Sequence, residues 1–116
     1  MKNARQKQLE LTFAGYLVAG MLQRGGAKFC FSPNAKHPGA VEFIVLNDET
    51  TYQSIKVKYS EKAARAKTLW KNWLRSGSHA LDHLIVVAGQ GKEIFAEPSV
   101  APNLAVDSDT SLSVLS

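Results

Sequence analysis

The sequence predicts a single α+β domain in which two helices flank a mixed β-sheet. Two stretches, residues 4–24 and 61–75, carry apolar residues at helical spacing. Five short apolar or alternating runs between and after them have the pattern of β-strands. With 116 residues, 45% of them hydrophobic and 21% charged, the chain has the size and composition of one globular domain with one core.

The first helix is predicted over residues 4–24, ended by the glycine pair at 25 and 26. Its apolar residues recur every four positions and are expected to face the sheet: Leu9, Phe13, Leu17 and Met21, with Val18 and Leu22 beside them. Gly15 and Gly20 each weaken a helix by about 1 kcal/mol relative to alanine. We therefore expect them where the helix approaches the sheet closely.

Three strands are predicted next, over residues 27–32, 40–47 and 51–60. Cys30 alternates with aromatic residues and is expected to be a small buried strand residue. The last two strands are separated by "NDET", which is typical of a turn. If Leu46 and Tyr52 close this hairpin, the antiparallel register places Glu42 directly opposite Lys56.

The second helix is predicted from an N-cap at Ser60 to Arg75, with Gly77 as its stop. Trp70 and Trp73 belong to its apolar stripe and are expected in the core. The cations Arg65, Lys71 and Arg75 fall on the opposite side.

Two further strands are predicted over residues 81–89 and 92–98, joined by the turn "GQGK", with the second as an edge strand ended by Pro98. The predicted order is therefore α-β-β-β-α-β-β. Residues 99–116 contain five serines, no aromatic residue and no Lys or Arg. This composition predicts a flexible tail after a domain of residues 1–98.

Charge is distributed unevenly along the chain. Residues 1–98 contain 14 Lys and Arg against 8 Asp and Glu, a net charge of +6 (14 − 8). This excess favours contact with a polyanion. The single cysteine excludes an intrachain disulfide and fits a reducing compartment, so we expect a cytoplasmic protein. The apolar run at residues 11–22 is shorter than the roughly 20 residues that span a membrane, so no membrane partner is expected.

Residues 9–98 resemble the PD-(D/E)xK restriction-endonuclease-like superfamily, and are most similar to its small stand-alone nuclease and resolvase-like members. "FAGYLVAGMLQRGG" resembles the first helix of the family. "AVEFIVLN" resembles the strand with the acidic metal ligand, and "YQSIKVKYS" the strand with the (D/E/Q)-x-K pair. "LDHLIVVAG" and "EIFAEP" resemble the last two strands. The resemblance implies a restriction-endonuclease-like core and an ancestral metal-dependent endonuclease activity.

Carried over position by position, the resemblance implies a degenerate site. Lys58 stands at the catalytic lysine, and Glu42 stands where the family usually has aspartate. Lys56 stands where the family has Glu, Asp or Gln, so the charge is reversed there. The glutamate expected in the first helix is replaced by Tyr16, and Glu10 is a poor substitute for it.

The reversed charge predicts a site without a metal ion or other cofactor. A Mg²⁺ ion needs two or three oxygen ligands, and the face offers only Glu42 beside Lys56 and Lys58. We expect Glu42 to form an ion pair with Lys56. At an effective dielectric constant of about 20, an ammonium 4 Å from a dication would be repelled by roughly 8 kcal/mol. His79 and His83 have a metal-ligand spacing, but Gly77 interrupts the helix before them.

Three functions remain open. The first is a nucleic-acid-binding protein that contacts phosphates through Lys56, Lys58, Arg24, Lys36, Arg65, Lys71 and Arg75. The second is a protein-binding module, such as an inhibitor, immunity factor or assembly subunit, docked through the tail or a sheet edge. The third is an active Mg²⁺-dependent endonuclease with Glu42 and Lys58 as catalytic residues. The lysines of residues 51–60 also fit a solvated strand face, and a homodimer is compatible with the sequence.

Overall fold

The computed structural model describes residues 3–32, 41–46, 51–76, 82–98, 100–106 and 110–114. These residues form two α-helices and six strands in the order α-β-β-β-α-β-β-β, which confirms the α+β class and adds one strand. The helices are α1 (Ala4–Arg24) and α2 (Ala63–Arg75). The strands are β1 (Lys28–Phe31), β2 (Val41–Leu46), β3 (Tyr52–Ser60), β4 (Asp82–Ala88), β5 (Glu93–Ala96) and β6 (Ser111–Val114).

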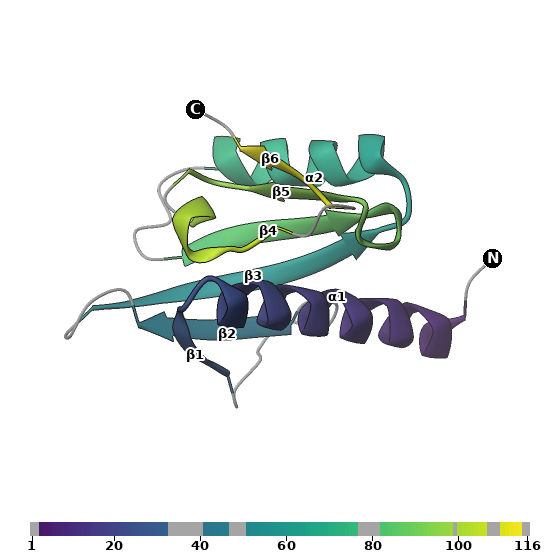
Figure 1. The fold of residues 1–116 in the computed structure, drawn as a ribbon. Helices are drawn as coiled ribbons and strands as arrows, with labels where there is room; N and C mark the ends of the chain where they lie inside the picture. The colour runs from purple at the N-terminus through teal and green to yellow at the C-terminus, as the bar shows by residue number, and fades with distance from the viewer. Residues whose placement is uncertain are drawn as a thin grey trace.

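The six strands form one mixed sheet whose spatial order follows the chain, from β1 at one edge to β6 at the other. Strands β1, β2 and β3 are antiparallel neighbours, as are β4 and β5. Strands β3 and β4 are parallel, and α2 provides the crossover that a parallel pair requires. Figure 1 shows α1 and α2 on opposite sides of this sheet, so the molecule has three layers.

Alternation along the strands sorts the side chains between two apolar clusters. Val57 and its β4 neighbour Ile85 are fully buried and belong to the larger cluster, which contains the buried side of α1. Leu84 and Val86 point to the other face and pack with Trp70 of α2. The residues of β3 that alternate with Val57 therefore lie on the α2 face.

Helix α1 has the predicted bounds. Its N-terminus is closed by a capping box, in which the Asn3 side chain accepts from the Gln6 amide at 2.9 Å and the Gln6 side chain accepts from the Asn3 amide at 3.0 Å. The helix ends at the cap residue Gly25. Neither this helix nor α2 is long and apolar enough to cross a membrane.

The buried face of α1 differs from the predicted one. Leu9 and Phe13, expected to face the sheet, are 65% and 45% exposed. The buried residues are Leu11, Ala14, Gly15, Val18, Met21 and Leu22. A Cβ on Gly15 would lie 3.2 Å from Val41 Cγ1, so this glycine does permit the expected close approach. A Cβ on Gly20 would instead meet the Arg24 guanidinium at 3.2 Å, away from the sheet.

The predicted flexible tail is wrong for the part of it that the structure describes. Val100 and Leu104 are buried in the same cluster as α1, and the Ala105 amide donates to the Met21 carbonyl at 3.0 Å. Strand β6 pairs in parallel with β5, so β5 is an inner strand. The segment has the composition of a linker, but Val100 and Leu104 pack into the larger core cluster. Burial of those residues offsets the entropy of ordering the segment.

Two local predictions also need correction. Ser60 is the last residue of β3, and the N-cap of α2 is Lys62, which makes no side-chain cap bond. Cys30 is exposed because it lies on the α2 face of β1, which is the sheet edge farthest from α2. Its alternation with aromatic residues indicated a strand correctly but could not show which face was covered.

The ordered segment after Pro98 provides a stability test with a matched control. Val100 is 0% exposed and Val106 is 41% exposed, so the same truncation to alanine removes buried contacts at only one of them. We expect Val100→Ala to lower the free energy of unfolding by about 2 kcal/mol. Val106→Ala should change it by less than about 0.5 kcal/mol. Urea denaturation measures both, and equal effects would mean that the segment does not contribute to the core.

Candidate functional site

The hairpin of β2 and β3 places the charged residues of the predicted site on one face. Glu42 pairs with Lys56 in the antiparallel register, which confirms the predicted alignment. Lys58 lies two residues further along β3, opposite Val86 of β4. All three charged side chains are half-buried and share the sheet face that carries α2.

Glu42 and Lys56 both belong to the described part of the chain, and they do not form the predicted ion pair. The Lys56 ammonium instead lies over the ring of Trp73, 5.5 Å from its centroid. An indole face attracts a cation through the ring quadrupole while leaving part of the ammonium hydrated. Trp73 is half-buried beside Trp70, which is 3% exposed, so both tryptophans belong to the α2 cluster as predicted.

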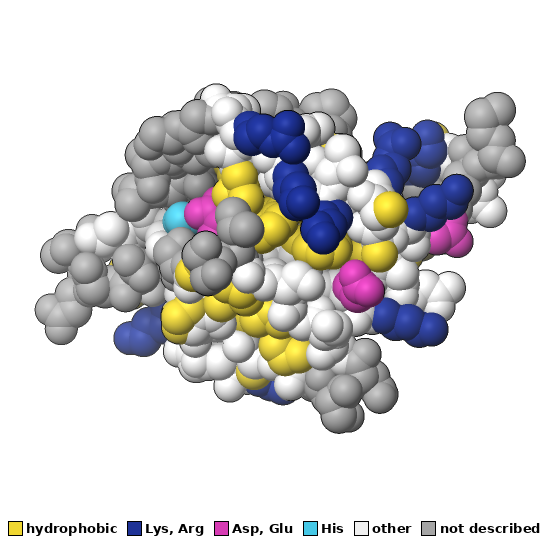
Figure 2. All heavy atoms as spheres, turned by 90° about the horizontal axis from the view of Figure 1, so that it is seen from above, with side chains coloured by type: hydrophobic (Ala, Val, Ile, Leu, Met, Phe, Trp, Pro, Cys, Tyr) yellow, Lys and Arg dark blue, Asp and Glu magenta, His cyan; other side chains and the backbone are white. Residues whose placement is uncertain are grey.

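The outer side of α2 is uniformly basic. Residues 63–75 contain four cations and no acidic residue, and all four are exposed: Arg65, Lys67, Lys71 and Arg75. Lys67, Lys71 and Arg75 follow one another every four residues, so they form one row along the helix. Figure 2 shows Lys and Arg side chains gathered over α2. We call these four residues the α2 cation row.

Helix α2 and the residues that flank it carry as much net positive charge as the whole chain. Residues 60–76 contain five cations, since Lys62 joins the row, and one acid, Glu61, which gives +4 (5 − 1). The net charge of the whole chain is also +4. Like charges four residues apart destabilise a helix by a few tenths of a kcal/mol per pair. The packing of Ala66 and Trp70 against the sheet must therefore offset the repulsion between the cations of α2. That repulsion does not stabilise the fold.

The structure brings together most, but not all, of the predicted phosphate contacts. Arg65, Lys71 and Arg75 belong to the α2 cation row, and Lys56 and Lys58 lie on the same side of the sheet. Arg24 ends α1 in the opposite layer, with its guanidinium next to Gly20. Lys36 lies outside the described residues.

Two cations on this side were not predicted as contacts. Lys67 is exposed on α2 one helical turn before Lys71, and Lys62 is exposed at the N-cap. The four-residue spacing to Lys71 is the sequence signal that would have identified Lys67. Nothing comparable marks Lys62.

Two buried polar residues, His83 and Gln53, lie on the α1 face of the sheet. His83 is buried, and its Nδ1 lies 3.2 Å from Glu97 Oε2. Gln53 is also buried, and its Oε1 has no hydrogen-bond partner among the described residues. No group of three potential metal ligands occurs in the described part of the chain, and His79 lies outside it.

Comparisons of the chain with protein-family models, with curated proteins and with solved structures found no significant match. The resemblance to the PD-(D/E)xK superfamily therefore stays a prediction from the quoted motifs.

The charge at position 56 can be tested with a divalent metal ion. Lys56→Glu would place two carboxylates, at positions 42 and 56, opposite each other across the hairpin. Lys58 would remain beside them. We expect Mn²⁺ to stabilise this variant by about 1 kcal/mol at five times its dissociation constant, measured as a rise in melting temperature. The wild-type protein and Lys71→Glu, which makes the same charge change on the outer side of α2, should show no such rise. Equal stabilisation of the wild type would show that the lysine does not exclude the ion.

Proposed function

We propose that the protein binds the phosphate backbone of nucleic acid through the α2 cation row and the neighbouring Lys56 and Lys58. The observation that carries the proposal is the concentration of charge on α2, where the exposed side of a 13-residue helix has four cations and no acid. A solvated helix face usually mixes both signs, because mixed charges stabilise the helix. A face of one sign is typical of a surface that meets a polyanion.

The dimensions of the row suit this partner. Lys67 and Arg75 are eight residues apart, which is about 12 Å along a helix axis. Duplex DNA carries about seven phosphate charges over the same length. Lysine and arginine contacts to phosphates position a protein without reading bases, so weak sequence preference is expected.

Lys56 and Lys58 extend the basic surface from the helix to the sheet. The contact with Trp73 holds the Lys56 ammonium at the side of α2, where it adds to the field of the row. Glu42 is the acidic residue directly opposite Lys56 on β2, and its lack of an ion pair with Lys56 leaves the lysine charge available to an anion.

A finer proposal concerns the family and the chemistry. The order of elements and the hairpin that carries Glu42 and Lys58 on one face support a restriction-endonuclease-like core with a degenerate site. Binding without cleavage is favoured, because Lys56 occupies the position where a second carboxylate would hold a metal ion. Mg²⁺ would be a cofactor only if the protein proved to be an endonuclease. A cytoplasmic location, inferred from the single cysteine, is part of the same proposal.

A protein-binding module is the second candidate, and a specific feature supports it. Leu9, Phe13 and Tyr16 form an exposed apolar row on α1, and Tyr16 packs edge-on against the exposed Phe31 at 5.9 Å. Exposed apolar clusters often mark protein contacts, including those of homodimers. The tail, expected as a docking element, forms the edge strand β6. Absence of nucleic-acid binding at low salt would favour this candidate.

The dependence of binding on salt tests the first proposal. The four residues of the α2 cation row alone predict a slope of about −3.6 in log K against log salt for duplex DNA, and contacts by Lys56 and Lys58 would make it steeper. The affinity should then fall by about 100-fold between 50 and 200 mM salt. Fluorescence anisotropy with labelled duplex and single-stranded oligonucleotides measures this, and an affinity that does not depend on salt would contradict phosphate binding.

A pair of arginines provides the matched variants. Arg75 and Arg24 are each the basic residue in the last turn of their helix, so replacement by glutamine removes the same favourable interaction with the helix dipole. We expect Arg75→Gln to weaken binding about tenfold at 50 mM salt and to reduce the slope by about 0.9. Arg24→Gln, in the opposite layer, should leave both unchanged. Equal effects of the two variants would contradict binding through the α2 side of the molecule.

A further inference from the structure

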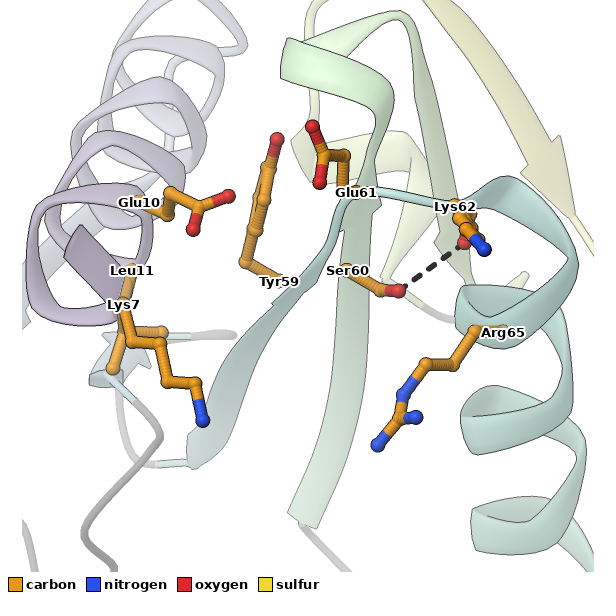
Figure 3. A pocket seen from close by; sticks show the side chains of 8 residues that line it. All are labelled: Lys7, Glu10, Leu11, Tyr59, Ser60, Glu61, Lys62 and Arg65. Atoms are coloured by element: carbon orange, nitrogen blue, oxygen red, sulfur yellow. Dashed lines mark hydrogen bonds between the residues drawn. The ribbon is translucent and has the colours of Figure 1, made fainter. Parts of the chain in front are cut away.

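A pocket of about 550 Å³ opens at the end of β3, between the first half of α1 and the start of α2. Its volume lies within the range of small-molecule sites. It is lined by residues from three elements (Figure 3): Lys7, Glu10 and Leu11 of α1, Tyr59 and Ser60 of β3, and Glu61, Lys62 and Arg65 at the start of α2. It shares Arg65 with the α2 cation row, whereas Lys67, Lys71 and Arg75 do not line it.

The charges in this pocket are segregated. Figure 3 shows the ammonium of Lys7 and the guanidinium of Arg65 pointing toward the same side of the pocket, from the two helices that flank β3. The carboxylates of Glu10 and Glu61 lie on the other side, near the Tyr59 ring. An anion on that side of the pocket would be attracted by both cations.

The start of α2 adds to the attraction for an anion. No acidic residue lies in its first turn, and its N-cap residue Lys62 makes no side-chain cap bond. The positive end of the helix dipole is therefore not neutralised by a carboxylate of the first turn. Ser60 is 7% exposed, and its hydroxyl donates to the Lys62 carbonyl at 3.2 Å, which holds the corner between β3 and α2 in place.

The Tyr59 ring lies between the carboxylates of Glu10 and Glu61 (Figure 3). Its hydroxyl accepts a hydrogen bond from the Gln90 amide at 3.1 Å, in the turn between β4 and β5. That turn is itself fixed, because Gly91 has φ +87° and a Cβ there would lie 2.9 Å from Leu17 Cδ2. A ring held in this way offers an aromatic surface on the carboxylate side of the pocket to the uncharged part of a ligand.

We propose that this pocket binds a phosphate monoester, with its phosphate between Lys7 and Arg65 and an attached ring against Tyr59. A monoester carries a charge of about −1.5 to −2 at neutral pH, more than the single charge of each backbone phosphate. The same chemistry occurs in a free nucleotide and in the terminal phosphate of a nucleic acid. The site shares Arg65 with the α2 cation row, but Lys7, on which its test depends, belongs to α1 and is not part of that row.

Titration of the protein with adenosine monophosphate, inorganic phosphate and adenosine, followed by backbone amide chemical shifts, tests the pocket. We expect the monophosphate to bind at least tenfold more tightly than adenosine, with shifts at residues 59–65. Lys7→Gln should weaken this binding about tenfold. Arg5→Gln, which removes an exposed cation from the first turn of the same helix and does not line the pocket, should not.

Several results would overturn the proposal. Equal binding of adenosine and its monophosphate would exclude the phosphate contact, as would an affinity that Lys7→Gln leaves unchanged. An unchanged melting temperature and circular dichroism spectrum would show that Lys7→Gln remains folded. If Lys7→Gln unfolds, Lys7→Arg serves instead, because it keeps the charge and should retain at least a third of the affinity. Loss of binding in a folded Lys7→Arg protein would contradict a charge-based contact.

Oligonucleotides with and without a terminal phosphate identify the source of the ligand. A nucleic-acid end is indicated if a 5′- or 3′-phosphate tightens binding at least fivefold and Lys7→Gln removes that gain. A free nucleotide is indicated if the monophosphate binds and the terminal phosphate has no effect. Failure of the monophosphate to bind would overturn this site alone, because salt-dependent binding of unphosphorylated oligonucleotides reports separately on the exposed row.

Discussion

Side-chain alternation along β3 is the constraint on which the rest of the structure depends. Ile55 and Val57 are fully buried against α1, so Lys56 and Lys58 must lie on the opposite face. A shift of one residue in the register would bury both lysines in the larger core cluster, at a cost that the domain could not offset. The same register pairs Glu42 with Lys56 and brings β3 alongside β4.

The same alternation places the two β3 lysines and the cations of α2 on one side of the molecule. Helix α2 covers β4 and packs through Ala66 and Trp70, which leaves its cations in solvent beside the β3 lysines. Helix α1, on the other side, exposes Leu9 and Tyr16. One side therefore carries the exposed cations of α2, and the other carries exposed apolar side chains of α1. The pocket at the end of β3 is lined from both layers, by Lys7 of α1 and Arg65 of α2 among others.

Features that depend on neighbours in the chain were predictable. The bounds of α1 followed from its periodicity and the glycines after it, and the hairpin register followed from the short turn between Leu46 and Tyr52. The alignment of Glu42 with Lys56 could therefore be predicted from the sequence, whereas the contact of Lys56 with Trp73 could not. That contact joins residues from two elements whose packing angle no local pattern specifies. Lys67 is an intermediate case, because its spacing from Lys71 is a local signal, whereas its exposure depends on how α2 packs against the sheet.

The sequence by itself determined the helices, five of the strands, the hairpin register and the charge of α2, because each depends on residues that are close along the chain. Tertiary structure decided which side of α1 is buried, since its apolar residues cover more of the helix than the sheet can. It also ordered Val100, Leu104 and β6, because the core had room for side chains that composition alone would leave in solvent. The pocket lined by Lys7 and Arg65 arises only from packing, since these residues are distant in sequence and line it from two different helices at the end of one strand.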